Sequence, residues 1–429
     1  MREDVNMKRK IMKHYHWIIA AVTFLLMIVG GGVANNRAAL FQVPVTEALG
    51  ISRGDFSLAI SIKSLTGFLL SLVSGALFIK LGYRKLVVAC MIIAAFGLGM
   101  TAFSYTVPMM CIAAALEGAS GLCLNVGCPR IIGTWFHRRY GLVMGFVTAA
   151  TGLGGTLFSI LLSKLLGSVG WQTSFILCGV FFAVIAVLVL VLVRNQPKEM
   201  GLKPYGEGYV PKKRQKTTAD HWEGFPIEEL QKKPMYYLLI VATFLSSTCT
   251  YIAFQVVAPH VQDCGMDADF AAKIQGLLLL ALTGTKLGFG FLSDRFGAKN
   301  MTLVSLGACA VSLWLLAEIS GPISAYIAAI VYAVALPLVG IVPPLLIPSL
   351  FGYRSGAKAM GIIISMISAA SMVASPISNY LRDAIGSYRP VFRVTALVAV
   401  GVMALYLVIY AMAAKERKQF EATQTEAEV

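Results

Sequence analysis

The chain has 429 residues, of which 57% are hydrophobic and only 13% are charged. This composition is too apolar for a soluble domain and predicts a membrane protein that crosses the bilayer several times. The formal net charge of +15 would suit a nucleic-acid-binding protein, but the basic residues lie between apolar runs and mark membrane topology instead.

Twelve apolar runs are each long enough to cross a hydrocarbon layer of about 30 Å as an α-helix. They lie at 17–43, 56–79, 86–104, 108–136, 141–163, 171–193, 235–259, 274–292, 301–317, 323–350, 359–380 and 391–413. The first run is too long for a cleaved signal peptide, so we expect it to remain as an anchor. The sequence therefore predicts an all-α membrane protein with twelve transmembrane helices.

Basic residues are concentrated in every second connection between these runs. One set of connections carries clusters of Lys and Arg, including nine of these residues from Arg194 to Lys233. The opposite connections hold only Arg53, Lys164, Lys273, Arg382 and Arg389. By the positive-inside rule, we expect both termini in the cytoplasm and the protein in the cell (plasma) membrane.

No catalytic or metal-binding pattern is recognisable. The eight cysteines lie almost all in apolar runs, without CxxC pairs or clustered histidines, so we interpret them as packing residues. The phosphate-loop pattern GxxxxGK[ST] and a catalytic triad are both missing, which argues against an ATPase or another enzyme. We therefore expect no cofactor and no metal, and neither do we expect a nucleic-acid partner.

An internal repeat divides the chain. Phe136 and Arg139 recur as Phe351 and Arg354, 215 positions later. The turns Gly75–Lys85 and Gly290–Asn300 match at the same offset. Such a repeat predicts two pseudo-symmetric six-helix bundles. We place the boundaries at 1–15 (cytoplasmic N-terminus), 16–194 (first bundle), 195–234 (cytoplasmic linker), 235–414 (second bundle) and 415–429 (cytoplasmic tail). Within the linker, the run PKKRQK is expected to be solvated and FPIEELQKK to form a short surface helix.

Lys286 lies inside an apolar run. At the helical rise it is roughly 12 Å from Asp294 and roughly 20 Å from Lys273, near the middle of the hydrocarbon layer. A lysine there costs about 2.5–3.5 kcal/mol and normally meets an anion. Its neighbours one helical turn away offer no carboxylate. The counter-charge must come from another helix, for example from Glu117, or from a ligand.

Arg37 follows three glycines and the pair Asn35 and Asn36. A broken or loosened polar segment that lines a cavity is a common way to build a binding site inside a membrane. We therefore interpret Arg37, Asn35 and Asn36 as substrate-binding candidates together with Lys286. The alternative for Arg37 is that its side chain extends to the membrane surface.

Within the predicted spans, basic residues outnumber acidic ones, which favours an anionic substrate. Glu117 is the one acid well inside a span. It either gains and loses a proton during transport or neutralises an arginine. Arg130 and Lys63 either serve the transport path or extend to the membrane surface. Arg393 is expected at the interface.

The paired turns resemble the loop signature G-x-L-x-D-R-x-G-x-K/R of the major facilitator superfamily. The second copy satisfies it with Gly290, Leu292, Asp294, Arg295, Gly297 and Lys299. The first copy keeps Gly75, Leu77, Lys80, Gly82, Arg84 and Lys85 but has Ile79 in place of the aspartate. The resemblance implies that these turns, with Asp294, Arg295, Lys299, Arg84 and Lys85, act in gating.

Four further segments resemble the oxalate–formate antiporter and monocarboxylate-porter branch of that superfamily: 133–155, 170–175, 194–206 and 386–392. The resemblance implies that basic residues on helices 1 and 8 handle a carboxylate, and Arg37 and Lys286 occupy those places. Two departures are visible. Leu282 stands where proton-coupled members carry an aspartate, and the helix-11 lysine of the oxalate exchanger is missing.

The resemblance implies a secondary active transporter for a small mono- or dicarboxylate. Transport would proceed by alternating access around a central site, as anion exchange or proton symport, with Glu117 and Arg130 as coupling candidates. The expected partners are the carboxylate anion, protons and the lipid bilayer. Two alternatives stay open: a non-transporting membrane sensor of the same fold, and a porter for another small solute or drug.

Overall fold

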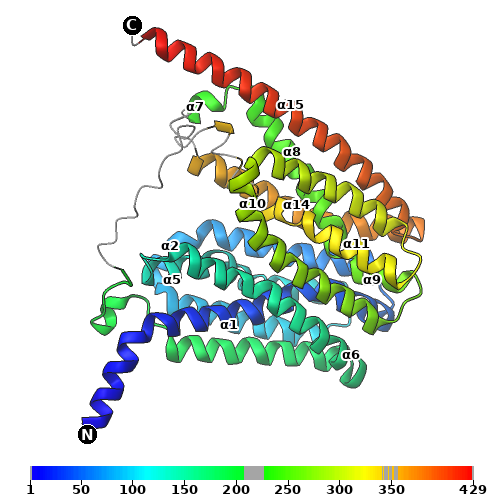
Figure 1. Cartoon of the computed structure of the whole chain (residues 1–429). Coiled ribbons are helices and arrows are strands. Elements are labelled where there is room, and N and C mark those ends of the chain that lie inside the picture. Colours follow the sequence, from blue (N-terminus) through cyan, green and yellow to red (C-terminus); the bar gives the residue numbers. More distant parts are fainter. Residues whose placement is uncertain are drawn as a thin grey trace. The chain divides into compact units, whose positions relative to one another are not determined.

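The computed structural model describes residues 2–206, 227–340, 342, 346, 350–351 and 356–427. These residues are almost entirely α-helical (Figure 1). The isolated bridge between Phe136 and Tyr205 is the exception. The all-α fold class predicted from the sequence is confirmed.

The first part of the chain forms α1 (Arg2–Leu49), α2 (Arg53–Ala102), α3 (Val107–Glu117), α4 (Ala119–Leu122), the π-helical turn η1 (Cys123–Gly127), α5 (Cys128–Trp135), α6 (Tyr140–Leu192) and the 3₁₀ turn η2 (Pro197–Met200). The second part forms α7 (Ile227–Leu230), α8 (Pro234–Phe254), α9 (Val257–Asp263), α10 (Ala268–Ala317), α11 (Pro322–Ala335), α12 (Pro337–Gly340), α14 (Gly356–Ile385) and α15 (Arg389–Ala427). The short helix α7 lies inside the segment FPIEELQKK, as expected, whereas the run PKKRQK lies outside the described residues.

The three longest helices each exceed the length of a single crossing. α2, α6 and α10 contain 50, 53 and 50 residues, and a straight helix of that size would measure about 75–80 Å, more than twice the hydrocarbon thickness. Each contains one glycine with a non-helical backbone: Gly82, Gly170 and Gly297 have φ of 73°, 78° and 79°. Only glycine adopts this region readily. Each long helix is therefore two spans joined at a glycine.

Nine helices in the described part of the chain are long and apolar enough to cross a membrane. Two of them, Arg53–Ala102 and Leu142–Leu192, are interrupted by the glycine bends at Gly82 and Gly170, and a third, Arg295–Ala317, begins beside the bend at Gly297. The protein is a multi-pass membrane protein. The count of twelve helices stays a prediction.

The backbone repeats the offset seen in the sequence. Glycines with positive φ occur at Gly50 and Gly265, and at Gly82 and Gly297, both 215 positions apart. The hydrogen bonds that cap two helix starts repeat at the same 215-residue offset. Ser52 Oγ accepts from the Asp55 N–H (3.0 Å), and Asp267 Oδ1 accepts from the Phe270 N–H (2.7 Å). The repeated turns thus share their backbone conformation as well as their sequence.

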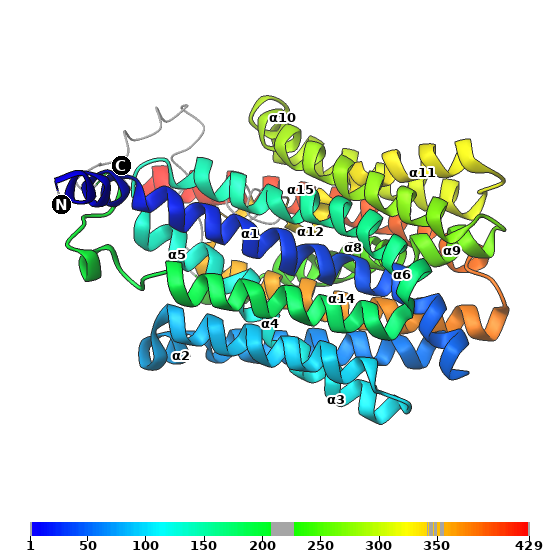
Figure 2. The same cartoon turned by 90° about the horizontal axis from the view of Figure 1, so that it is seen from below.

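The chain forms two compact units. Unit 1 comprises residues 1–214 with 267–280, and unit 2 comprises 215–266 with 281–429. In unit 1, α1 packs along α6, and α2 packs along α3 and α6 (Figure 2 shows the helices from a second direction). The start of α10 belongs to unit 1, where the Thr156 hydroxyl donates to the Gly276 carbonyl (3.0 Å). In unit 2, α8 packs against α14 and α15.

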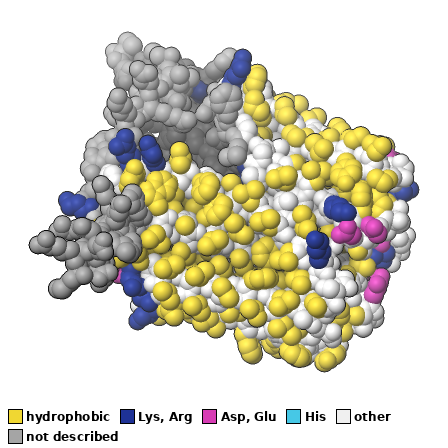
Figure 3. All heavy atoms as spheres, turned by 60° about the horizontal axis from the view of Figure 1, so that its bottom comes forward, with side chains coloured by type: hydrophobic (Ala, Val, Ile, Leu, Met, Phe, Trp, Pro, Cys, Tyr) yellow, Lys and Arg dark blue, Asp and Glu magenta, His cyan; other side chains and the backbone are white. Residues whose placement is uncertain are grey.

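Hydrophobic side chains cover much of the exposed surface. Leu72, Phe96 and Ile323 are 65%, 68% and 76% exposed. Figure 3 shows one face on which apolar side chains form a broad band and charged side chains gather toward its ends. Apolar surface of this extent marks contact with lipid.

Candidate functional site

Lys286 lies in the part of α10 that precedes Gly297. It is half-buried, and it forms no ion pair with any carboxylate that the structure describes. The hydroxyl of the neighbouring Thr285 donates to the carbonyls of Leu282 (3.0 Å) and of Ala333 on α11 (3.1 Å). This side chain therefore joins α10 to α11. Leu282, which stands at the position of the family's aspartate, is buried. Lys286 is therefore a half-buried cation of α10 whose counter-ion is not among the described side chains.

Glu117, the suggested partner for Lys286, contacts a different lysine. Its Oε2 lies 3.9 Å from Lys63 Nζ of α2, and its Oε1 accepts a hydrogen bond from the Thr101 hydroxyl (3.0 Å). Glu117 is only 2% exposed, and Lys63 is 17% exposed. Lys63 is thus one cation beside Glu117, and the prediction that Glu117 neutralises an arginine stays a prediction.

Glycines bring these three side chains together. Positions 63 and 101 lie equally far before and after the bend at Gly82, so both halves of α2 reach Glu117 at the end of α3. A Cβ at Gly97 would lie 2.9 Å from the Glu117 nitrogen, and a Cβ at Gly118 would lie 2.5 Å from the Lys63 oxygen. Only small residues permit such close helix approach. The cluster Lys63–Glu117–Thr101 is a packed junction of three spans.

The glycine-rich segment of α1 is not a broken helix. α1 continues through it without interruption. The expectation of a loosened segment is wrong because the glycines serve close packing against α6: a Cβ at Gly154 would overlap the Ile28 carbonyl oxygen. Asn36 stabilises the same contact between α1 and α6. Its Nδ2 donates to the carbonyls of Gly32 (2.8 Å) and of Gly155 on α6 (2.7 Å).

Asn36 is fully buried, and its Oδ1 has no hydrogen-bond partner among the described residues. The structure thus places Asn36 between α1 and α6 with its donors already used. The side chains of Asn35 and Arg37 lie outside the described ones. Their roles as substrate ligands stay predictions.

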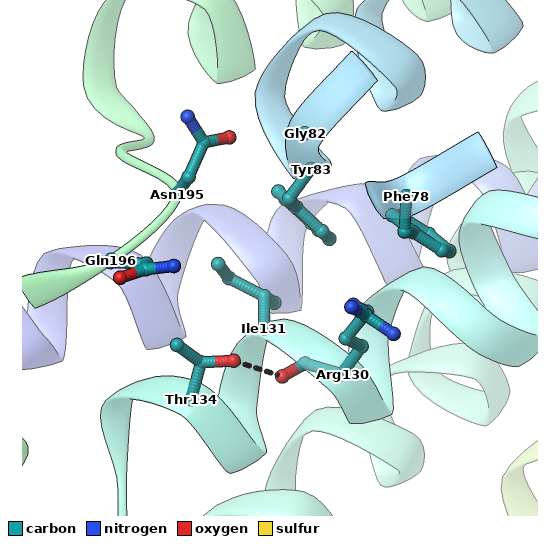
Figure 4. Close-up of a pocket in the computed structure, with 8 residues that line it drawn as sticks. All are labelled: Phe78, Gly82, Tyr83, Arg130, Ile131, Thr134, Asn195 and Gln196. Carbon is teal, nitrogen blue, oxygen red and sulfur yellow. Dashed lines mark hydrogen bonds between the residues drawn. The ribbon is translucent and has the colours of Figure 1, made fainter. Parts of the chain in front are cut away.

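Arg130 is exposed at the end of unit 1 that holds Gly82. Its guanidinium lies over the Phe78 ring, 4.9 Å from the centroid, a favourable cation–π geometry. It lines a pocket whose other walls are given by Phe78, Gly82, Tyr83, Ile131, Thr134, Asn195 and Gln196 (Figure 4). Arg130 thus lies beside the first of the two repeated turns.

The two repeated turns, which we expect to act in gating, make different contacts. At the Gly82 turn, the Arg84 N–H donates to Asn195 Oδ1 (2.8 Å), and Lys85 is exposed. At the Gly297 turn, Lys299 Nζ lies 5.6 Å from the centroid of the Tyr410 ring, and Arg295 is exposed. The side chain of Asp294 and the surroundings of Gly290 lie outside the described part.

Asn195 belongs to a segment, 194–206, that the sequence analysis assigned mainly to the linker. In the structure this segment packs on unit 1. The Trp135 indole N–H donates to the Arg194 carbonyl (3.2 Å), and the Tyr205 N–H donates to the Trp135 carbonyl (2.9 Å). The Tyr205 carbonyl in turn accepts from the His137 N–H (3.1 Å). The resemblance of segment 194–206 to a segment of the family is the sequence feature that could have indicated this packing.

Arg393 is paired rather than free at the interface. Its Nη2 lies 2.6 Å from Glu318 Oε1, and both side chains are about half exposed at 48% and 45%. The nearby Tyr388 hydroxyl donates to Asn379 Oδ1 (2.6 Å). These contacts join the end of α10 to α15 and α14, and they supply no site for a ligand.

Within the described residues, no group of three or more His, Cys, Asp or Glu side chains could hold a metal ion. The eight cysteines are free thiols, and six of them are buried. Among the described side chains, Lys63 and Glu117 pair inside candidate membrane spans, and Lys286 lies in α10. Such groups inside a helical membrane protein typically mark a transport path.

A multi-pass helical protein with charged side chains inside its spans belongs to the class of membrane transporters. The family model of the Major Facilitator Superfamily matches residues 22–357 and 285–428. The chain belongs to this superfamily.

Curated relatives are distant. An MFS-type transporter of Escherichia coli (strain K12), YhjX, is 25% identical over 337 residues, which cover 76% of this chain and 77% of the relative. Monocarboxylate transporter 11 of Homo sapiens is 22% identical over 396 residues, 88% of this chain and 79% of the relative. MFS transporter asaE of Aspergillus flavus is 23% identical over 335 residues, 75% and 70% of the two chains.

Solved structures show the same fold. The nucleoside transporter NupG superposes with a TM-score of 0.74 at 15% identity and covers 92% of this chain and 99% of its own. A bacterial homolog of the human lysosomal transporter Spinster, in an inward-facing and unoccupied conformation, gives a TM-score of 0.67 at 14% identity, with 94% and 97% covered. At these identities the similarity concerns the fold alone.

Proposed function

We propose that this protein is a secondary active transporter of a small mono- or dicarboxylate in the oxalate–formate antiporter and monocarboxylate-porter branch. In this proposal, twelve helices form two six-helix bundles that alternate access to the two sides of the plasma membrane. Both termini face the cytoplasm. Lys286, a half-buried cation of α10 without a described carboxylate partner, is the observation that carries the proposal.

A carboxylate substrate would supply the counter-charge that Lys286 lacks. An ammonium in a membrane span is costly when it is alone, so binding of an anion there is favoured by both Coulomb attraction and hydrogen bonding. The names of two distant relatives, monocarboxylate transporters 11 and 13, support the same substrate class. Arg37 is the proposed second cation, on the strength of its place in the sequence.

Exchange is the proposed mode of transport. Glu117, the candidate proton carrier, is held by Lys63 and Thr101. These contacts support a packing role for Glu117 rather than proton transfer during the cycle. Leu282 removes the other candidate, because it cannot carry a proton. A proton-coupled mode, if it operates, runs through Glu117.

The test is uptake of radiolabelled oxalate, lactate, pyruvate or formate into proteoliposomes that contain the same unlabelled carboxylate. A thermal-shift screen that adds acetate, malonate and succinate selects the substrate. Lys286→Gln should lose uptake while its melting temperature stays close to the native one. The matched control is Lys273→Gln on the same helix, where Lys273 is 59% exposed and pairs with Asp269 (2.7 Å); it should transport normally.

Three results would count against this proposal. Normal uptake by Lys286→Gln would remove the anion site from Lys286. Uptake of a nucleoside or a drug, but of no carboxylate, would assign the chain to another substrate class, as the names of NupG and of the Fujikurins efflux protein illustrate. Binding without flux of any substrate would favour a membrane sensor of the same fold.

A further inference from the structure

The pocket beside the Gly82 turn is a polar cavity with one cationic wall. Arg130 of α5 stands on one side, and Asn195 and Gln196 approach from the other (Figure 4). All the lining residues belong to unit 1. The pocket is separate from Lys286 and plays no part in the proposed carboxylate site.

Arg130 has no anionic partner in this pocket. Its guanidinium stacks on Phe78, and it forms no ion pair with any side chain that the structure describes. Thr134 contacts only its backbone, since the Thr134 hydroxyl donates to the Arg130 carbonyl (2.9 Å). A guanidinium presents five N–H donors in a planar fork, and stacking on an aromatic ring leaves that fork available.

A second donor near the pocket is also unsatisfied. Arg84 Nε is buried and has no hydrogen-bond partner within the described part of the chain. The backbone N–H of the same residue is already bonded to Asn195 Oδ1, which in turn is fixed by Glu199 through a bond from Asn195 Nδ2 to Glu199 Oε1 (2.9 Å). A buried donor without an acceptor costs about 1–3 kcal/mol.

The internal repeat shows what is missing at this turn. The second copy carries a carboxylate at Asp294, but the corresponding position in the first copy is Ile79, which is 80% exposed. The first turn therefore lacks the acidic residue of the second copy, and beside it Arg130 forms no ion pair with a described side chain and Arg84 Nε has no described acceptor.

We propose that this pocket binds a phosphate-type oxyanion, held by the Arg130 guanidinium with the Gln196 amide opposite. Arginine binds phosphate through two parallel N–H···O bonds. Exposed Lys80 and Lys85 on the same turn add positive charge around the pocket. Clusters of this kind next to a membrane span attract phospholipid headgroups. The phosphate can therefore come from a free inorganic ion or from a lipid headgroup.

The test uses the purified full-length chain in detergent and measures its melting temperature. The probes are sodium phosphate against sodium chloride at equal ionic strength, and dioctanoyl phosphatidic acid against dioctanoyl phosphatidylcholine. The native protein should melt several degrees higher with phosphate, with phosphatidic acid, or with both. A response to phosphate identifies a free ion as sufficient, and a response to phosphatidic acid alone identifies the lipid headgroup.

Two variants separate the pocket from general surface charge. Arg130→Gln should lose the response, whereas Lys198→Gln, which removes an exposed charge that does not line the pocket, should keep it. If Arg130→Gln cannot be purified, Gln196→Glu at an exposed position places a carboxylate opposite the guanidinium and should also abolish the response. Stabilisation that persists in Arg130→Gln or Gln196→Glu overturns the proposal, as does the lack of any response in the native protein.

Discussion

Lys63 and Glu117 form an ion pair across α2 and α3, with Nζ and Oε2 3.9 Å apart and the carboxylate almost fully buried. Thr101, from the far side of the bend in α2, completes the contact through Oε1. One acid thus links three membrane spans. This arrangement governs both the stability of unit 1 and the availability of Glu117 as a proton carrier.

Removing one member of this pair should destabilise the protein more than removing both. Loss of one partner of a buried pair costs about 3–5 kcal/mol, and we expect the low end because Lys63 retains some exposure. Lys63→Met leaves the Glu117 charge without this lysine. The double variant Lys63→Met/Glu117→Gln removes both charges and should recover part of the loss. Melting temperatures of the native protein, both single variants and the double variant form the required cycle. Additive losses would mean that the pair contributes no coupling energy.

Glu117→Gln also tests the mode of transport. We expect carboxylate exchange to be faster than net uptake into empty vesicles. Exchange should survive Glu117→Gln, because a neutral amide can still accept from Thr101. The measurement is uptake with and without internal carboxylate, at fixed pH and then with an imposed proton gradient. Strong proton-driven uptake by the native protein would reject exchange. If that uptake persisted in Glu117→Gln, this residue would not be the proton carrier.

The repeated glycine bends should differ in their tolerance of a side chain. Gly82→Ala and Gly297→Ala both place alanine at a positive φ, which costs about 1–3 kcal/mol in such sparsely populated regions. A Cβ at Gly82 would also lie 3.2 Å from Asn195 Oδ1, whereas one at Gly297 meets no neighbour within 4 Å. Gly82→Ala should therefore lower the melting temperature more. In an Asn195→Ala background the two alanine substitutions should cost about the same; a difference that remains unchanged would contradict the role of Asn195.

The contact between α1 and α6 should not accept even a methyl group. Gly154→Ala would force its Cβ into the Ile28 carbonyl, and overpacking of this kind typically costs about 1–3 kcal/mol. Gly167→Ala on the same helix is the control, because nothing lies within 4 Å of a Cβ there. Thermal unfolding in detergent compares the two. Equal melting temperatures would show that the helices can separate at no cost.

The apolar runs and the 215-residue offset were sufficient to predict the helical class, the repeat and the position of two bends. The pattern could not show that Lys63 meets Glu117. That contact depends on a hairpin whose two halves lie equally far from Gly82, and on glycines at 97 and 118 that shorten the distance between helices.

The prediction of a cavity-lining segment at Asn36 was wrong for a different reason. A polar residue beside glycines favours a cavity when it is considered alone, but small residues also permit close packing, and the facing Gly154 and Gly155 decided between these outcomes. The pocket at Arg130 could not be predicted, because it depends on Asn195 and Gln196, which come from a segment expected to belong to the linker. Contacts between segments far apart in the chain produce no recognisable residue spacing in a single sequence.

The 215-residue offset places Tyr332 of unit 2 at the position that corresponds to Glu117 of unit 1. The Tyr332 hydroxyl is buried and bonds the Thr250 carbonyl. One copy of the duplicated frame therefore holds a charge pair at this place, and the other holds a neutral hydroxyl. Removing one partner of a buried charge pair leaves an uncompensated charge, whereas removing a hydroxyl leaves none, so we expect the two halves of the carrier to respond unequally to equivalent substitutions.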